Sequence, residues 1–482
     1  MSDSLLSFLD SFNQVVGGYV LVFILLGAGF YFTIRSRCVQ LRLFRRSVVE
    51  MLAGIRHRKP GDISPFQAFA TGMASRVGMG NIAGVAIAIK LGGPGAVFWM
   101  WMTALLGMAS SLIECTLAQV YKEPHPDGTF RGGPAYYIRK GLGQSWLALI
   151  FVFSLLLAFG LIFNAMQSNA IAGMLKEAYQ LDPVWVGVGL VVLTGPIIWG
   201  GIRKVGMVSE WMVPVMAGGY ILLTAYVLVR NFSAIPEVLL LIVKSAFGFG
   251  PAAAGLTGYA VAQAVIMGVR RGLFSNEAGM GSAPNAAAAA SATHPVNQAL
   301  MQMLGVFVDT IIICTCTALL ILLSGYDWRA GEAAGVAITA RALATQVGGW
   351  SIHFLAWAVF FFAFSSIIGN YAYAEGNVDF LSKRPWLMTV FRLMVLGMVY
   401  FGAVAKVDLV WQLGDISQAL MTIINVVAIL LLSGIAFRTL KDYERQVALG
   451  KEKVHFDRNV LGEDANTLSE GVWVCKTVEI KH

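Results

Sequence analysis

The sequence contains many long apolar stretches with no charged residue, and this feature constrains the fold more than any other. The segments 16–34 and 146–172 are two examples. The hydrocarbon core of a membrane is about 30 Å thick and takes roughly 20 apolar residues of helix to cross. Only 13% of the 482 residues are charged, against about a quarter in soluble domains. The chain is therefore predicted to be an all-α integral membrane protein embedded in a lipid bilayer.

Eleven apolar segments are predicted to be transmembrane helices. They cover residues 16–34, 64–90, 96–120, 146–172, 184–199, 212–229, 256–290, 300–323, 350–374, 386–404 and 409–437. Tryptophan stands near many of the segment ends, for example Trp146, Trp199, Trp211 and Trp386. This is expected where helices meet the membrane–water interface. No oligomeric state is predicted.

Arginine and lysine gather in the connecting segments on one side of the predicted spans. The segment between the first two spans contains Arg35, Arg37, Arg42, Arg45, Arg46, Arg56, Arg58 and Lys59. Glu50 is its one acidic residue before Asp62. Because short cytoplasmic segments are enriched in Arg and Lys, the N-terminus is predicted outside and the C-terminus in the cytoplasm. The net charge of +8 then reflects membrane topology, and no nucleic-acid partner is expected.

Two of the predicted spans are interrupted at mid-length by polar, glycine-rich sequence. Residues 74–84 read ASRVGMGNIAG, and residues 271–284 read RGLFSNEAGMGSAP. The two spans are five apart and, by the charge pattern, cross the membrane in opposite directions. This pattern is typical of an inverted repeat of five plus five helices with two discontinuous helices, preceded here by one extra N-terminal helix.

The repeat predicts four parts of the chain. Residues 1–62 form the N-terminal helix and a basic cytoplasmic loop. Residues 63–254 form the first five-helix repeat with the external loop that follows it. Residues 255–437 form the second repeat, and residues 438–482 form a cytoplasmic tail.

A break inside a membrane helix supplies groups that can bind ions and zwitterions. Free N–H and C=O groups in hydrocarbon cost several kcal/mol each, so such a break persists only where it lines a protein cavity. Half-helix N-termini favour a carboxylate, and unwound carbonyls can coordinate Na⁺. The alternative is close helix packing through Gly80 and Gly84, which form a GxxxG pattern. Polar and charged residues within the breaks favour a binding site, namely Asn81, Ser275, Asn276 and Glu277.

Five segments of the chain resemble the alanine or glycine:cation symporter family. Residues 78–86 read GMGNIAGVA, 91–101 read LGGPGAVFWMW, 131–138 read RGGPAYYI, 271–284 read RGLFSNEAGMGSAP and 307–318 read FVDTIIICTCTA. The resemblance implies the fold of the sodium:neurotransmitter symporters and sodium-driven uptake of glycine and alanine. It also implies a bacterial cytoplasmic membrane protein that is not an enzyme and needs no cofactor besides sodium as the coupling ion.

The same resemblance implies one sodium position and leaves the occupation of a second one open. The carbonyls of Ala74 and Val77, with Ser365 and Ser366, would hold one ion. Asn81 and Ser275, with the Arg76 carbonyl, lie where the wider fold class has another. For the serines, an alternative is a hydrogen bond from each hydroxyl to a carbonyl of its own helix.

The substrate-binding residues implied by the resemblance are Met79, Gly80, Asn81, Gln167, Phe274, Ser275 and Asn276. The Gln167 amide has both donor and acceptor atoms and can meet the ammonium and the carboxylate of an amino acid. Its alternative role is an interhelical hydrogen bond. Many family members have Trp where this chain has Asn370, which leaves the substrate range and the L/D preference open.

Other functions are alternatives of lower rank. A proton-coupled amino-acid symporter of the same fold is one, and an ion channel or an intramembrane enzyme is another. Buried ionisable residues in membrane spans default to functional hypotheses, and here they are Glu114, Glu277, Asp309 and Arg271. Arg271 and Asp309 are predicted to pair as part of a gate.

Overall fold

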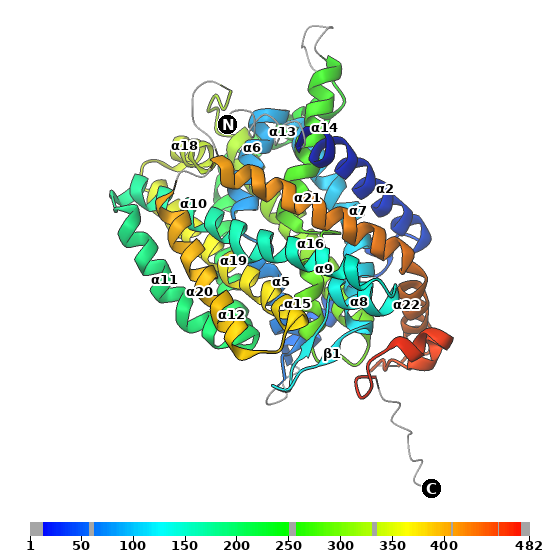
Figure 1. Ribbon diagram of the computed structural model, residues 1–482. Coiled ribbons are helices and arrows are strands. Elements are labelled where there is room, and N and C mark those ends of the chain that lie inside the picture. Colours follow the sequence, from blue (N-terminus) through cyan, green and yellow to red (C-terminus); the bar gives the residue numbers. More distant parts are fainter. Residues whose placement is uncertain are drawn as a thin grey trace.

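The computed structural model describes residues 13–56, 62–249, 257–329, 335–405, 408–451 and 453–473. In these residues the fold is helical apart from one two-stranded antiparallel sheet, as Figure 1 shows. The predicted boundary between the repeats at 254/255, and the basic residues Arg58 and Lys59, lie outside the described residues.

The described residues of the first half of the chain form two strands and fifteen helical pieces. They are η1 (Asn13–Val20), α2 (Leu21–Arg35), α3 (Val39–Arg42), α4 (Phe44–Arg56), α5 (Pro65–Arg76), η2 (Gly80–Gly84), α6 (Val85–Gly92), α7 (Gly95–Val120), β1 (Glu123–Pro124), β2 (Phe130–Arg131), α8 (Pro134–Gly141), α9 (Ser145–Leu155), η3 (Leu156–Ile162), α10 (Phe163–Tyr179), α11 (Pro183–Trp199), α12 (Gly201–Arg230) and η4 (Phe232–Ala234). The elements η1, η2 and η3 are π-helical, and η4 is a 3₁₀ turn.

The second half begins with α13 and ends in a short 3₁₀ segment. Its elements are α13 (Ile235–Ala246), α14 (Thr257–Asn276), α15 (Ala283–Ala289), α16 (Pro295–Val306), η5 (Phe307–Cys314), α17 (Thr315–Leu322), α18 (Val336–Val347), α19 (Ser351–Leu381), α20 (Pro385–Val404), α21 (Asp408–Leu431), α22 (Ser433–Ala448) and η6 (Arg458–Thr467). The element η5 is π-helical.

By length and apolar composition, the described residues contain 8 helices able to cross a membrane, or up to 9 if the bent pair α5 and η2–α6 counts as one span. The prediction of a multi-span helical membrane protein is confirmed. Two of the eleven predicted segments fall outside this count. Segment 184–199 is α11, which has only 17 residues. Segment 256–290 is divided between α14, which carries Arg270 and Arg271, and the seven-residue α15.

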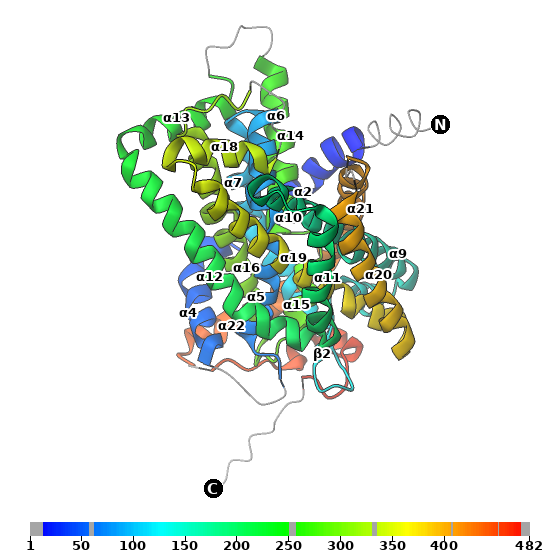
Figure 2. The same ribbon diagram turned by 90° about the vertical axis from the view of Figure 1, so that its left-hand side faces the viewer.

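The two interrupted segments lie in the interior of the helical bundle. All of η2 and α15 is buried, and so is the end of α5. Helices α7, α16 and α19 pack against α15, and α16 and α19 also pack against α5. Helix α11 lies at the left-hand edge of the molecule in Figure 1, and α20 lies on the right-hand side in Figure 2. Large apolar side chains are exposed on the outer helices, among them Trp185, Leu222 and Leu393. Such side chains suit contact with lipid.

Local chemistry explains where the broken helices begin and end. Ser64 and Gln67 form a capping box at the start of α5, with Pro65 in the first turn. The helix stops after Arg76 because Val77 leaves helical geometry, with ψ at 83°. The pair α5 and η2–α6 is bent by 46° there. A break in one of these helices is therefore observed where the polar, glycine-rich sequence predicts it.

Candidate functional site

The first break, residues 77–79 between α5 and η2, has free backbone N–H groups that find no helical partner and are bonded by side chains instead. The Gly78 N–H donates to Asn81 Oδ1 at 2.9 Å, and the Met79 N–H donates to Gln167 Oε1 at 3.3 Å. Gln167 comes from α10, so α10 is tied directly to the start of η2. Both amide residues lie at the break, and both act here as caps for free backbone donors.

The second break, residues 277–282 between α14 and α15, is hydrogen-bonded to Glu114 of α7. Glu277 has φ of +58°, and Gly279 and Gly281 have φ of +83° and +85°, so the chain cannot continue as a helix. The Gly279 N–H donates to Glu114 Oε1 at 3.1 Å, and the Gly281 N–H donates to Glu114 Oε2 at 3.2 Å. Asn425 Nδ2 donates to the same Oε2 at 2.8 Å and to the Gly279 carbonyl at 2.9 Å. A buried carboxylate thus serves as the acceptor for this loop through both of its oxygens.

Glu277 connects the two breaks. Its Oε1 accepts from Ser75 Oγ at 2.6 Å, and its Oε2 accepts from Ser282 Oγ at 2.7 Å. Ser75 Oγ also lies 2.8 Å from Asn370 Oδ1, and Asn370 Nδ2 donates to Asn164 Oδ1 at 3.1 Å. Asn370 therefore faces the breaks.

Asp309 of η5 makes a second connection between the breaks. Its carboxylate accepts from Asn81 Nδ2 at 2.7 Å, from Ser275 Oγ at 2.8 Å and from Thr310 Oγ1 at 2.7 Å. Asn276 donates through Nδ2 to Thr310 Oγ1 at 3.2 Å. The structure thus brings together Asn81, Ser275 and Asn276, which were predicted as a group, around an acidic residue.

The predicted pair between Arg271 and Asp309 is wrong. Arg271 Nη2 lies 3.0 Å from Asp415 Oδ2, and Arg270 Nη2 lies 2.7 Å from the same oxygen. Asp309 instead belongs to the polar group at the breaks. The physical reason is that the Arg271 side chain of α14 is directed toward α21, where Asp415 supplies the carboxylate.

The two serines of α19 face the first break. Ser365 Oγ donates to the Val77 carbonyl at 3.4 Å, and Ser366 Oγ donates to the Ser75 carbonyl at 3.0 Å. Each hydroxyl also contacts the Phe362 carbonyl of its own helix, at 2.8 Å and 3.0 Å. The hydroxyls and the unwound carbonyls form a cluster of neutral oxygens, the kind of ligand that hard cations take.

Glycine at position 78 allows this close approach. A Cβ at Gly78 would collide with Ser366 Oγ. Ala74 lies in the same last turn of α5, one residue before the carbonyl that Ser366 contacts. The Arg76 side chain turns away from this cluster, because its Nη1 donates to the Gln302 carbonyl and to Gln302 Oε1, each at 3.1 Å.

A small cavity of about 10 Å³ lies between the breaks and α10, on the order of one water molecule. Its lining residues are Ser75, Arg76, Gly80, Phe159, Phe163, Gln167, Phe274, Glu277 and Asn370. The rings of Phe163 and Phe274 meet edge to face at 5.3 Å. Gly80, Gln167 and Phe274 of the predicted substrate residues line the cavity, whereas Met79, Asn81, Ser275 and Asn276 are not among its lining residues.

Several residues at the site were not predicted. Asn425, Ser75 and Ser282 bond directly to the breaks or to Glu277. Ser75 and Ser282 lie inside the two interrupted segments, so their position in the sequence could have indicated them. Asn425 is one amide in an apolar helix, and nothing in its neighbours along the chain distinguishes it.

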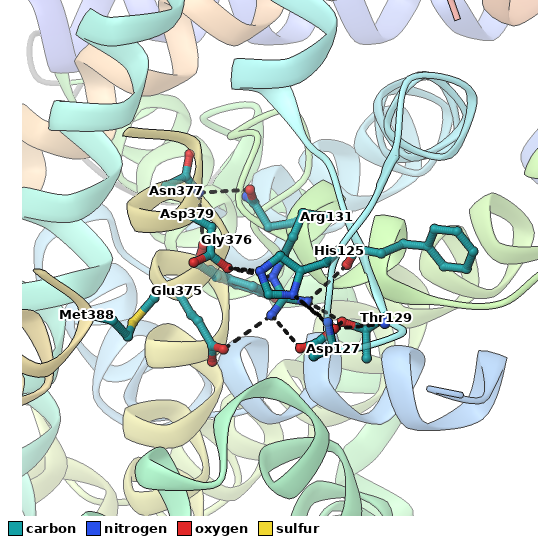
Figure 3. A network of polar contacts seen from close by, with 12 residues as sticks. His125, Asp127, Thr129, Arg131, Glu375, Gly376, Asn377, Asp379 and Met388 are labelled. Carbon is teal, nitrogen blue, oxygen red and sulfur yellow. Dashed lines mark hydrogen bonds and ion pairs between the residues drawn. The ribbon is translucent and has the colours of Figure 1, made fainter. Parts of the chain in front are cut away.

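A separate polar network joins the β1–β2 hairpin to the end of α19, as Figure 3 shows. Arg131 Nη2 lies 3.2 Å from Asp127 Oδ2 and 3.4 Å from Glu375 Oε1, and Arg131 Nε lies 2.9 Å from Asp379 Oδ2. His125 Nε2 lies 3.6 Å from Asp379 Oδ2. Asp127 of the hairpin and Asp379 of α19 therefore both form ion pairs with Arg131.

The network shifts the pKa values of Asp127 and Arg131, two of its charged members in the hairpin. Burial alone would raise the pKa of the Asp127 carboxyl. Hydrogen bonds from the side chain and backbone of Thr129, with His125 and the Arg131 guanidinium beside it, hold that pKa well below its usual range. Burial opposes the charge of Arg131, but Glu375, Asp379 and Asp127 raise its pKa. All of these contacts favour the charged forms.

Several known proteins are similar to this chain over most of its length. An uncharacterized transporter of Haemophilus influenzae is 51% identical over 430 residues, which is 89% of each chain. The probable sodium/glutamine symporter GlnT of Bacillus subtilis is 47% identical over 444 residues, 92% of each chain. The sodium/alanine symporter AgcS of Methanococcus maripaludis is 36% identical over 449 residues, 91% of this chain and 97% of that one.

A solved structure and a family model are also similar to this chain. The crystal structure of a manganese transporter from Eremococcus coleocola covers 85% of this chain and 86% of its own, with 16% identity and a TM-score of 0.40. Residues 2–457 match the model of the sodium:alanine symporter family. With nearly the whole chain matched, this protein belongs to the sodium:alanine symporter family and is a membrane transporter, not an enzyme.

Proposed function

We propose that this protein is a sodium-coupled symporter that takes up glycine and L- or D-alanine by alternating access. The observation that carries the proposal is the cluster of neutral oxygens at the first break. Ser365 and Ser366 hydroxyls lie within 3.4 Å and 3.0 Å of the Val77 and Ser75 carbonyls. These groups suit Na⁺, which prefers several oxygen ligands.

The proposed substrate site lies beside this cluster. The N–H groups of Gly78 and Met79 mark the start of a half-helix, where a carboxylate is favoured. Gln167 caps the Met79 N–H at 3.3 Å. During transport the amino-acid carboxylate takes its place there, and the Gln167 amide then contacts the ammonium and the carboxylate of the substrate. Phe163 and Phe274 close the other side of the cavity, so bulky amino acids are excluded.

The proposed topology has eleven spans. The first is α2, and two five-helix repeats follow in residues 63–254 and 255–437, in the arrangement of the sodium:neurotransmitter symporters. In this topology α11 and the α14–α15 pair both cross the membrane. The N-terminus lies outside, the C-terminal tail lies in the cytoplasm, and the membrane is the bacterial cytoplasmic membrane. The basic segment between the first two spans supports this orientation.

The test is uptake of radiolabelled amino acids into proteoliposomes with and without a Na⁺ gradient. We expect Na⁺-dependent, electrogenic uptake of glycine, L-alanine and D-alanine, with little uptake of glutamine. One Na⁺ moved through 100 mV yields about 2.3 kcal/mol, enough for roughly fiftyfold accumulation. Exchange of labelled for unlabelled alanine without a gradient distinguishes a symporter from a channel. Equal uptake in Na⁺-free buffer over a proton gradient would overturn the sodium assignment.

A proton-coupled symporter is the second candidate. It is favoured by Glu277, a buried carboxylate that links Ser75 of the first break to Ser282 of the second. If protons drive uptake, Glu277→Gln should abolish coupling while exchange of labelled alanine continues. If sodium drives uptake, the same variant should keep its dependence on the Na⁺ gradient.

A further inference from the structure

A large basic groove lies between the end of α2, the turn that follows it and α22. It has a volume of about 640 Å³. Its lining residues are Arg35, Ser36, Arg37, Arg42, Phe437, Leu440, Lys441, Glu444, Arg445 and Ala448. In Figure 1, α2 descends toward α22 at the right-hand edge of the molecule. The groove shares no lining residue with the two breaks or with the network of Figure 3.

Positive charge dominates the groove. Five of its side chains are cationic and one, Glu444, is anionic. Glu444 Oε1 is already paired with Arg42 Nη2 at 2.7 Å, and Arg445 Nη2 is paired with Asp442 Oδ1 at 2.7 Å. Among the described residues, Arg35, Arg37 and Lys441 have no carboxylate within ion-pair distance. These three cations are therefore available to an anion.

The turn after α2 is built in an unusual backbone conformation. Arg37 and Cys38 have φ of +55° and +53°, in the left-handed region that side chains rarely adopt. Arg42 supports this turn, because its Nη2 donates to the Ser36 carbonyl at 2.9 Å and its Nε to the Arg37 carbonyl at 3.4 Å. The turn therefore holds Arg37 at the groove by specific contacts, at the cost of local strain.

The groove also has an apolar side that continues onto the membrane surface of the protein. Phe437, Leu440 and Ala448 form one wall, and the Arg35 guanidinium lies 5.9 Å from the centre of the Phe437 ring. Arg35 is the last residue of a candidate membrane span, Val15–Arg35. The preceding Ile34 is 60% exposed. Cations at the end of a span beside an apolar surface are the arrangement that recognises the headgroups of anionic lipids.

We propose that this groove binds the phosphate headgroup of an anionic phospholipid from the surrounding membrane. Arg35, Arg37 and Lys441 contact the phosphate, and the acyl chains lie along Ile34 and Phe437. The bound lipid connects the first membrane helix to α22, the helix that leads into the C-terminal tail. This site is independent of the proposed substrate and ion, because it shares no residue with the breaks.

The test is native mass spectrometry of the full-length protein in detergent with phosphatidylglycerol or phosphatidylcholine added. The double variant R37Q/K441Q removes two cations from the groove. The double variant K383Q/R384Q is the matched control, because it removes two cations from another connecting segment. We expect the wild-type protein and the control to retain phosphatidylglycerol in preference to phosphatidylcholine. We expect R37Q/K441Q to bind phosphatidylglycerol roughly thirtyfold more weakly, or about 1 kcal/mol for each charge removed.

Further arms separate the lipid from other anions and from misfolding. Inorganic phosphate at the same concentration should not displace the lipid, because it makes no contact with the apolar wall. Displacement by inorganic phosphate would overturn the lipid assignment in favour of a soluble anion. Equal weakening in both double variants would also overturn the proposal, since the effect would then be general surface charge. Substrate-dependent thermal stabilisation of R37Q/K441Q shows that the variant is folded, and an R37K/K441R variant should restore lipid binding.

Discussion

Substitutions of Glu114 test how much its hydrogen bonds to the second break contribute to the stability of the protein. Its two carboxylate oxygens accept three hydrogen bonds, from the Gly279 and Gly281 N–H groups and from Asn425 Nδ2. In Glu114→Gln the amide oxygen can take the place of Oε2 and keep two of these donors. The amide NH₂ then faces the Gly279 N–H and leaves it buried without an acceptor. Each buried unsatisfied group costs about 1–3 kcal/mol.

The expected free energy of unfolding follows from that count. Glu114→Gln should lower it by about 1–3 kcal/mol. Glu114→Ala should lower it further, because the Gly279 and Gly281 N–H groups both lose their acceptor, while Asn425 Nδ2 keeps only the Gly279 carbonyl. Glu123→Gln is the control, since Glu123 lies in a partly exposed ion pair with Lys140 at 2.7 Å. Such a pair is worth about 0–1 kcal/mol. Equilibrium unfolding in mixed detergent, followed by tryptophan fluorescence, measures the differences. Equal stability of the Gln and Ala variants would refute the acceptor count, and wild-type stability in both would refute the role of Glu114.

Three more sets of substitutions test the site itself. Ser365→Ala and Ser366→Ala should raise the Na⁺ concentration for half-maximal transport, and an unchanged Na⁺ dependence of both and of the double variant would place the ion elsewhere. Asn81→Ala and Gln167→Ala should each weaken alanine binding at least tenfold, or about 1.4 kcal/mol, and calorimetry on monodisperse protein giving wild-type affinity would contradict the pocket. Gly80→Ala should destabilise the protein by about 1–3 kcal/mol, because its Cβ would lie 2.9 Å from the α14 backbone; a stable, active variant would show that the breaks can separate there.

The positions of the membrane spans could be predicted from the sequence, because most spans are continuous apolar segments whose ends are visible in the chain itself. The segments 96–120 and 386–404 match α7 (Gly95–Val120) and α20 (Pro385–Val404) to within one residue at each end. The first break was also predictable, since glycine and polar residues at mid-span disfavour a continuous helix. The predicted span 350–374 ends short of α19, which continues to Leu381. There Glu375 and Asp379 make the helix polar, and they are bonded to Arg131.

Partners between distant segments could not be predicted in the same way. Nothing near Glu114 in the chain indicates that it accepts from residues 165 and 167 positions away. The mistaken pairing of Arg271 with Asp309 has the same origin, because charge alone does not say which carboxylate is near. Ser365 and Ser366 were assigned to the first break through a family resemblance. In the described residues their hydroxyls contact the Val77 and Ser75 carbonyls and not that of Ala74, and their role with Na⁺ is a prediction.

The network at the hairpin has a mechanical consequence. One guanidinium, that of Arg131, contacts Glu375 and Asp379 on α19 and Asp127 within the hairpin. A shift of the hairpin away from α19 therefore strips two carboxylates from the same cation at once, and His125 loses Asp379 in the same movement. In an intermediate position the charged groups have lost their ion pairs and gained no new ones, so we expect such positions to be poorly populated. The hairpin and α19 should therefore be either in contact or fully separated, with few arrangements in between.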